Sequence, residues 1–456
     1  MRSPRFLLLA TSALAVATLA QDKQEQHPSS REDEGFGRVH MDISCAPPVA
    51  AEFNRALALL HNFWYVRALE RFKQVLPHGF EQQEKAAKLF ESVYARHPDH
   101  PGALHYLIHA YDDPLHAQQG LKAARAYAQA AAAVPHALHM PSHIFTRLGY
   151  WDESAATNRK GWDVSEADVR GAGESGAYRD YHNLNYLEYA YIQLGRFREA
   201  QQAVDIAAAQ YQALPDKKTA PDTPELQSRH VRGRTIYAVP DRVVYGYFDM
   251  LTRLEVEAGR WEEAAKIPVL VSSRDFVAVS LQWQAKAAAV RKDVGTAQAA
   301  ATRLVSLSQE PGQHPFAKLI ITLQAKEAEA FAAEAAGDSD SALAKLKEAI
   351  AIEDSIDDLS QPPYPVIPAN ELAGNLLLDV NRYAEAAPYF QKTLQRTPNR
   401  PKAIFGVARA AQAMGDNATA VERYREFLTM WKDADLDRPE LAAAKEFLAK
   451  RGMCEK

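Results

Sequence analysis

The stretch VNRYAEAAPYFQKTL, residues 380–394, decides the fold because it returns as MGDNATAVERYREFL at residues 414–428. Each copy opens near a residue, Asn381 or Gly415, that tolerates the left-handed backbone conformation in which helices end. Asn381 and Gly415 lie 34 positions apart. An amphipathic segment follows each of them, so the pattern predicts a helix, a tight turn and a second helix, repeated along the chain.

The same turn and helix occur earlier in the sequence, in four further copies: LGYWDESAATN (148–158), LGRFREAQQAV (194–204), AGRWEEAAKI (258–267) and AGDSDSALAKLKEAI (336–350). A Gly followed by a short Glu-Ala helix at a period near 34 residues is typical of the second helix of a tetratricopeptide repeat. The wider intervals predict inserted loops. No convincing alternating strand is found. The sequence therefore predicts an all-α fold, an α-solenoid of tetratricopeptide-like helix-turn-helix repeats.

The first residues have the pattern of a secretory signal peptide, predicted over 1–20. Arg2 and Arg5 precede an apolar run, residues 6–17, that is too short to span a bilayer. Small residues lead to an expected cleavage after Ala20. A short membrane anchor is the alternative, but no charged stop-transfer flank follows. We therefore expect a periplasmic or secreted protein without an integral membrane segment after cleavage.

The rest of the chain divides by composition. Residues 21–46 are polar and predict a disordered leader. Residues 47–358 predict the helical array with its histidine-rich repeats, 359–368 a proline-rich connector, and 369–456 the C-terminal repeats. The two cysteines, Cys45 and Cys454, lie near opposite ends of the chain, so we expect them to be unpaired or to pair with another molecule.

The charge balance bears on the partner. The chain of 456 residues has a formal net charge of -5 and no basic stripe with interleaved aromatic residues. This pattern disfavours nucleic acid as a partner. A protein or a small-molecule ligand in the concave groove of the solenoid is the expected partner.

Histidines are concentrated in one part of the chain, because eight of the fifteen lie between His97 and His143. His105 and His109 are four residues apart, which places both on one face of a helix, and Asp112 follows. His136, His139 and His143 are spaced three and four apart. A single helix through this segment would place all three on one face. Pro141 instead favours a helix that begins there, which would leave His136 and His139 in the preceding loop.

The next predicted helix repeats this spacing. His182, Asn185 and Tyr189 lie at the same distances from Gly195 as the earlier three histidines do from Gly149. First helices of such repeats line the concave surface. These side chains, together with Asp112 and Asp180, are therefore the predicted ligand-binding residues.

Neutral imidazoles bind Zn, Cu, Ni or Fe, and three histidines with an open position are typical of catalytic metal sites. The candidate metal ligands are His105, His109, His136, His139 and His143, with a transition metal such as Zn or Cu as the possible cofactor. Helix capping and hydrogen bonding between repeats remain the alternative, and His100 before Pro101 has the pattern of such a cap. Neither HExxH nor a Cys/His finger spacing occurs in the sequence.

The chain also resembles a family of bacterial exported tetratricopeptide-repeat proteins. The resemblance lies in residues 44–72, HPGALHYLIHAYDDP (100–114), PHALHMPSHIFTRLGYW (135–151), residues 371–400 and RPEL (438–441). It implies an α-solenoid and no settled activity. Compared with that family, the N-terminal part looks shortened, and Asn370 stands where an Arg would be expected.

Two functions follow as hypotheses. The first is an exported scaffold that binds a ligand, a partner protein or a metal in a histidine-rich concave groove. The second is a metal-dependent hydrolase or oxidase, of Zn or Cu type, that uses the same histidines, with Asp112 or Asp180 as an orienting or acid/base group.

Overall fold

The computed structural model describes residues 80–130, 132–214, 229–231, 234–236, 239–268, 274–313, 315–356 and 366–451. The predicted signal peptide, the leader, Cys45 and Cys454 lie outside these residues. The chain divides into two compact units, residues 1–82 with 230–235, and residues 83–229 with 236–456. The second unit contains the helical repeats described below.

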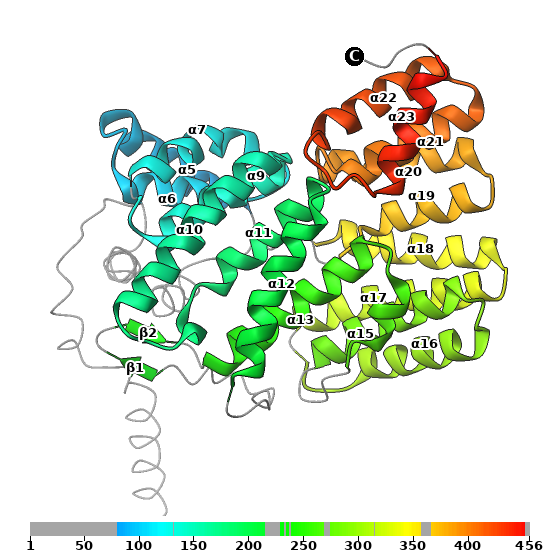
Figure 1. Cartoon of the computed structure of the whole chain (residues 1–456), viewed down its shortest axis with the longest axis horizontal. Coiled ribbons are helices and arrows are strands. Elements are labelled where there is room, and N and C mark those ends of the chain that lie inside the picture. Colours follow the sequence, from blue (N-terminus) through cyan, green and yellow to red (C-terminus); the bar gives the residue numbers. More distant parts are fainter. Residues whose placement is uncertain are drawn as a thin grey trace, which may run out of the picture. The chain divides into compact units, whose positions relative to one another are not determined.

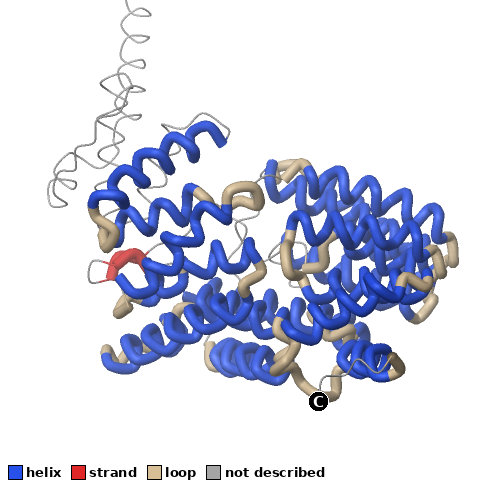
Figure 2. The backbone as a smooth tube through the Cα atoms, turned by 90° about the horizontal axis from the view of Figure 1, so that it is seen from above, coloured by secondary structure: helices blue, strands red, loops and turns tan. Residues whose placement is uncertain are grey.

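The described part of the chain is almost entirely helical (Figures 1 and 2). Consecutive helices pack against each other in pairs, and each pair is a helical hairpin. The helices are α5 (Phe80–Arg96), α6 (Pro101–Ala110), α7 (Ala117–Ala130), α8 (Pro135–His139), α9 (Pro141–Leu148), α10 (Trp151–Gly171), η2 (Gly176–Tyr178), α11 (Tyr181–Gln193), α12 (Phe197–Gln212), α13 (Val239–Glu257), α14 (Trp261–Lys266), α15 (Arg274–Val290), α16 (Val294–Gln309), α17 (Pro315–Ala335), α18 (Ser339–Asp354), α19 (Ala369–Asp379), α20 (Tyr383–Arg396), α21 (Pro401–Met414), α22 (Asn417–Met430) and α23 (Pro439–Ala449).

The predicted turns are confirmed by the backbone. A residue with positive φ closes the first helix of each pair from α9–α10 to α21–α22, and at the six predicted copies these residues are Gly149, Gly195, Gly259, Gly337, Asn381 and Gly415. A seventh turn, between α15 and α16, was not predicted. It uses Lys292, with a φ of 59°, where no Gly or Asn marks the turn in the sequence. The α-solenoid of helix pairs is therefore the observed fold.

One small feature departs from the prediction that strands are absent. Residues Arg229–Val231 (β1) and Arg234–Ile236 (β2) pair in a two-stranded sheet. It lies in the long insertion between α12 and α13. Among the described residues, no helix combines the length and the hydrophobicity that a membrane crossing requires.

The C-terminal helices share a hydrophobic core with helices from the early part of the second unit. One cluster of buried side chains combines residues of α10 to α13 with residues of α21 to α23. The Trp431 indole donates to the carbonyl oxygen of Gln193 at 2.9 Å, and the Trp151 indole donates to that of Asn399 at 2.8 Å. Gly149 has no room for a side chain here, because a Cβ would meet the carbonyl oxygen of Pro398.

The other core cluster runs through the middle repeats into the C-terminal ones. It includes side chains of α15 to α21, together with Val366 and Ile367 from the end of the predicted proline-rich connector. The described end of that connector is therefore packed into the core, and α19 contacts α18 directly.

Candidate functional site

Four helices bring six histidines together. His105 and His109 come from α6, His136 and His139 from α8, His143 from α9 and His182 from α11. Each ring lies within 6.3 Å, between ring centroids, of at least one other ring in this set. We call this set the histidine cluster.

The prediction that His136 and His139 lie in a loop before Pro141 is wrong. Both residues are helical, in α8, and Met140 keeps a helical backbone between α8 and α9. Pro141 occupies the first position of α9, where its missing N–H costs little. The near-continuous helical path places His139 and His143 one turn apart on the same face.

The centre of the cluster is formed by His139, His143 and His182. The Nε2 atoms of His139 and His143 lie 2.9 Å apart. One ring nitrogen from each of the three residues fits within a span of 4.8 Å, and these three form the group of potential metal ligands found in the described part of the chain. His139 and His143 are buried, whereas His182 is exposed.

Both buried rings are held in place through their other nitrogen. Asn158 donates its Nδ2 to the carbonyl oxygen of Ser154 at 2.8 Å, so its Oδ1 accepts from Nδ1 of His139 at 2.9 Å. Asp112 accepts from Nδ1 of His143 at 2.8 Å and from Nε of Arg147 at 2.9 Å. Each imidazole therefore turns its Nε2 toward the other.

Burial keeps two of these rings neutral. Removal from water lowers the pKa of His136 to about 3. The pKa of His139 is held well below its usual value, because of burial and because His182, His143 and His136 are close. A neutral imidazole is the form that binds a metal ion.

Asp112 stays ionised although it is buried. Burial alone would raise the pKa of this carboxyl, but the charge and hydrogen bond of His143, together with those of Arg147, outweigh it and lower the pKa to about 2. A carboxylate that orients a histidine in this way is typical of metal sites.

A second pair of imidazoles lies beside the first. Nε2 of His105 and Nε2 of His109 are 3.1 Å apart on one face of α6. The His105 ring stacks on Tyr127, with centroids 5.5 Å apart, and meets the His136 ring edge-on at 5.2 Å. His105 is buried, and the side chain of His109 reaches solvent.

Tyr186 on α11 completes the wall of the cluster. Its ring centroid lies 4.7 Å from that of His139 and 5.1 Å from those of both His143 and His182. Burial raises the pKa of this phenol well above its usual value, so the hydroxyl remains protonated. Tyr186 was not among the predicted residues, although its position four residues after His182 was a usable signal.

The predicted ligand-binding residues divide between different places. Asp112 and His182 belong to the histidine cluster, whereas Asp180 caps the start of α11 by accepting from the backbone N–H groups of His182 and Asn183. Asn185 and Tyr189 belong to a separate polar region. His100 caps α6 through its ring, as predicted.

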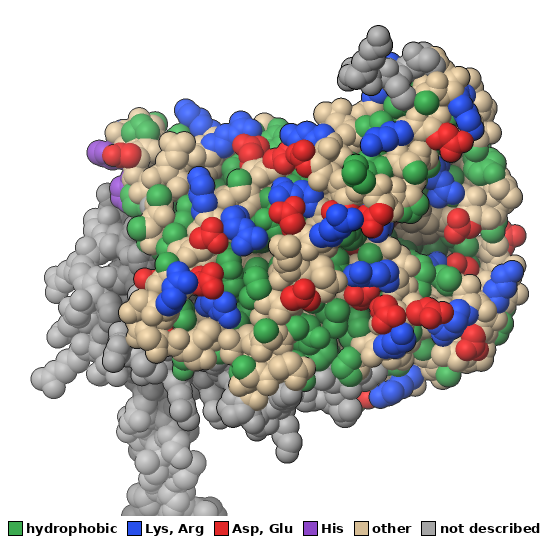
Figure 3. Space-filling view, viewed as in Figure 1, with side chains coloured by type: hydrophobic (Ala, Val, Ile, Leu, Met, Phe, Trp, Pro, Cys, Tyr) green, Lys and Arg blue, Asp and Glu red, His purple; other side chains and the backbone are tan. Residues whose placement is uncertain are grey.

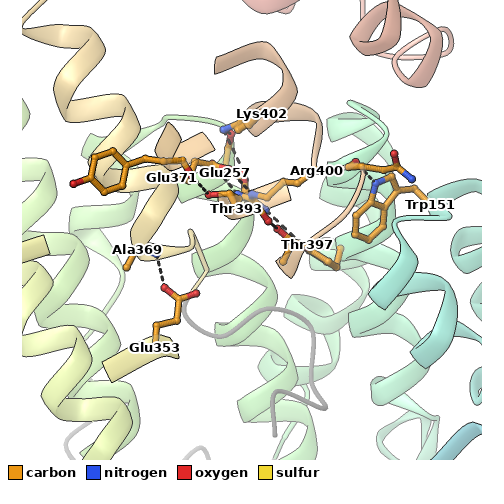
Figure 4. A network of polar contacts seen from close by, with 12 residues as sticks. Trp151, Glu257, Glu353, Ala369, Glu371, Thr393, Thr397, Arg400 and Lys402 are labelled. Atoms are coloured by element: carbon orange, nitrogen blue, oxygen red, sulfur yellow. Dashed lines mark hydrogen bonds and ion pairs between the residues drawn. The ribbon is translucent and has the colours of Figure 1, made fainter. Parts of the chain in front are cut away.

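That separate region consists of two buried arginines with their acidic partners. Arg253 donates through Nε to Glu188 at 2.9 Å. It also donates to Oδ1 of Asn185 at 2.9 Å, which fixes the orientation of the guanidinium. Arg400 binds Glu257 at 2.7 Å and Glu371 at 2.6 Å, as Figure 4 shows. We call these residues the arginine network.

The arginine network was missed at the level of sequence. Glu188 stands inside the apolar run YLEYAYI (186–192), and such an isolated charge at a core position predicts a buried ion pair. The partner was not predictable, because Arg253 lies 65 residues away and Arg400 lies 143 residues from Glu257.

The face of the molecule in Figure 3 gives a contrast to the cluster. Acidic and basic side chains are interspersed over it, and histidines show only at one edge. Such a mixed, salt-bridged surface is ordinary for a soluble helical protein.

No protein-family model and no curated protein matches the chain. Among solved structures, it is similar to the crystal structure of yeast Tom70, with 13% sequence identity, 89% of this chain and 96% of that chain covered, and a TM-score of 0.31. The P58(IPK) TPR domain shares 12% identity over 89% of this chain and 99% of that chain, with a TM-score of 0.24.

A third structure, the APC/C hetero-tetramer Cut9–Hcn1, shares 11% identity over 82% of this chain and 81% of that chain, with a TM-score of 0.26. At these TM-scores the likenesses carry no argument about the function of this chain. The assignment as a helical-repeat protein rests on its own helix pairs.

Proposed function

We propose that this chain is a helical-repeat scaffold that binds a transition-metal ion through His139, His143 and His182. The observation that supports the proposal is the 2.9 Å approach of the Nε2 atoms of His139 and His143. In both rings Nδ1 lies against a fixed oxygen, which leaves the two Nε2 atoms facing each other.

Two neutral rings in this orientation would set lone pairs against each other at this distance, and a positive charge between them removes the repulsion. A shared proton would serve, as an ordinary N–H···N hydrogen bond. A divalent cation bound to both nitrogens serves equally and gains two strong ligands. His182 would supply a third.

The donor set indicates the class of metal. Three imidazoles without a thiolate suit Zn, Cu, Ni or Fe, and they exclude Mg²⁺ and Ca²⁺, which take oxygen ligands. Asp112 and Asn158 would act as the orienting partners that raise the affinity of such sites. The exposed His182 leaves the fourth position accessible to a ligand from solvent.

A metal-dependent hydrolase is the second candidate, and the open fourth position favours it. A water molecule bound there would have its pKa lowered to about 7 and become a nucleophile. If the position takes up a protein side chain or a small molecule instead, the chain is a binding module. Activity assays with the loaded protein separate the two.

Metal content tests the proposal. The protein is purified without a His-tag or chelator, incubated with Zn²⁺, Cu²⁺, Ni²⁺ or Fe²⁺ in turn, desalted and analysed for elements. We expect the double variant His139→Ala/His143→Ala to hold at least one equivalent less than the wild type. His97→Ala, which removes an exposed histidine outside the cluster, is the matched control and should change nothing.

Absence of tightly bound metal from the wild type with every ion would overturn the proposal. A double variant that folds, by its circular dichroism, and keeps all the metal would overturn it as well. Loss of metal by His97→Ala alone would show that the ion binds at His97 and not in the histidine cluster.

We also propose that the protein is exported, on the basis of residues 1–20. N-terminal sequencing of the protein from periplasmic and culture fractions tests this. A mature protein that begins at Gln21 supports export, and a cytoplasmic protein that begins at Met1 contradicts it.

A further inference from the structure

We infer that the histidine cluster binds a second transition-metal ion between His105 and His109, beside the first. This inference rests on the proposed function, because it extends the same cluster from one ion to two. The observation behind it is nevertheless independent, because His105 and His109 lie on helix α6, which contributes none of the three ligands of the first site.

The two imidazole pairs have the same geometry. In each pair the histidines are four residues apart along a helical path, and their Nε2 atoms face each other at 2.9 Å or 3.1 Å. Two imidazole nitrogens bound to one tetrahedral Zn²⁺ at about 2.05 Å lie about 3.3 Å apart. Both pairs are therefore within about 0.4 Å of the separation that a shared ion requires.

The surroundings also hold the second pair in place. The His105 ring lies between Tyr127, on which it stacks, and the edge of the His136 ring. It is 5% exposed, so it has little freedom to turn away. His136 is the neighbouring imidazole, with its ring centroid 5.2 Å from that of His105.

Two connections join the second pair to the first. The rings of His109 and His143 have centroids 6.3 Å apart, and those of His136 and His139 are 6.2 Å apart. Two ions held by these pairs would be neighbours within one cluster.

Charge and access are compatible with two ions. Asp112 lies near both pairs, since it binds His143 and acts electrostatically on His109, and Asp180 acts on His136. His109 and His182 each present an exposed side chain, one beside each site. Water or an anionic ligand can therefore complete both coordination shells and offset the remaining positive charge.

Stoichiometry tests the inference. The full chain, in a chelator-free buffer, is titrated with Co²⁺, whose visible absorption reports tetrahedral sites, and with Zn²⁺ in a calorimeter. We expect two equivalents for the wild type, one for His105→Ala/His109→Ala and one for His139→Ala/His143→Ala. The variant with all four substitutions should bind none.

His109→Ala guards against misfolding, because its side chain is exposed and its loss leaves the core of α6 intact. It should bind the second equivalent at least ten-fold more weakly and leave the first unchanged. A wild type that binds one equivalent, unaffected by either α6 variant, would overturn the inference and keep the proposed function. A wild type that binds no ion would overturn both.

Discussion

The histidine cluster and the arginine network are two polar regions that differ in how their side chains are paired. In the network every strong charge meets its opposite, since Arg400 binds Glu257 and Glu371 while none of the three is more than 1% exposed. In the cluster imidazole meets imidazole, and the carboxylate of Asp112 accepts a hydrogen bond from His143.

The two regions differ in whether the chain itself supplies the partner of each polar group. Within the network the chain supplies both signs, so a buried guanidinium is satisfied without help and links the C-terminal repeats to α13 and α19. The cluster instead brings imidazole nitrogens together in close pairs. The first region holds the fold, whereas we propose that the second takes a cation from outside.

Breaking the network should have the largest effect. Arg400→Met leaves the carboxylates of Glu257 and Glu371 buried without their partner, and we expect a loss of about 3–5 kcal/mol in the free energy of unfolding. Urea unfolding followed by circular dichroism measures it. Arg382→Met is the matched control, because Arg382 binds Asp340 and Glu385 at the surface and its loss should cost less than about 1 kcal/mol.

Equal losses for the two arginine variants would contradict the role assigned to the network. The buried network would then contribute no more to the stability of the fold than an ion pair at the surface.

Glu353 sharpens the comparison, because this buried carboxyl near the network accepts the backbone N–H of Ala369 at 2.7 Å, and no arginine among the described residues forms an ion pair with it (Figure 4). Burial raises its pKa from 4.5 to about 7. The protonated form therefore stabilises the fold, fully below pH 4.5, and this contribution disappears as the pH rises past 7.

Glu353→Gln should remove that dependence. Relative to the variant, the wild type should lose up to about 3 kcal/mol of stability between pH 4.5 and pH 8, at about 1.4 kcal/mol for each unit of pKa difference. Denaturant unfolding at four pH values measures the difference. A constant difference across this range would show that Glu353 has an ordinary pKa.

Filling the cluster should stabilise the protein by a smaller amount. Zn²⁺ at 100 times the dissociation constant of the first site should add about 2.7 kcal/mol to the free energy of unfolding of the wild type. In His139→Ala/His143→Ala the first site is missing, so this contribution should disappear. Thermal unfolding with and without Zn²⁺ measures this. A double variant that Zn²⁺ stabilises as much as the wild type would place the bound metal outside these two histidines.

The smallest effect should come from the orienting carboxylate. Asp112→Asn keeps a hydrogen-bond acceptor for His143 but loses the charge, and we expect the affinity for the first ion to fall 10- to 100-fold. Competition with a metal-binding dye measures it. An unchanged affinity would show that Asp112 serves only Arg147.

The sequence predicted what local spacing determines. Glycine or asparagine at the turns located the helix pairs, because a left-handed residue has few alternatives, and the turn at Lys292 was missed because lysine carries no such signal. His105 and His109 were placed on one face for the same local reason. The contact of His139 with His182 needed the packing of α8 on α11.

Contacts between residues far apart in the sequence could not be predicted from local spacing. Tyr189 was grouped with the histidines by its periodicity, but its hydroxyl faces Arg400, 211 residues away. Such a contact depends on how far the superhelix turns over several repeats, and that is the sum of many small packing rotations.

X-ray absorption at the metal edge of the loaded wild-type protein tests the central claim most directly. We predict a first shell of nitrogen ligands at about 2.0–2.1 Å with the outer-shell scattering of imidazole rings, which the variant with His105, His109, His139 and His143 all changed to Ala should lose. A shell of oxygen ligands without imidazole scattering, or a spectrum identical in that variant, would contradict it.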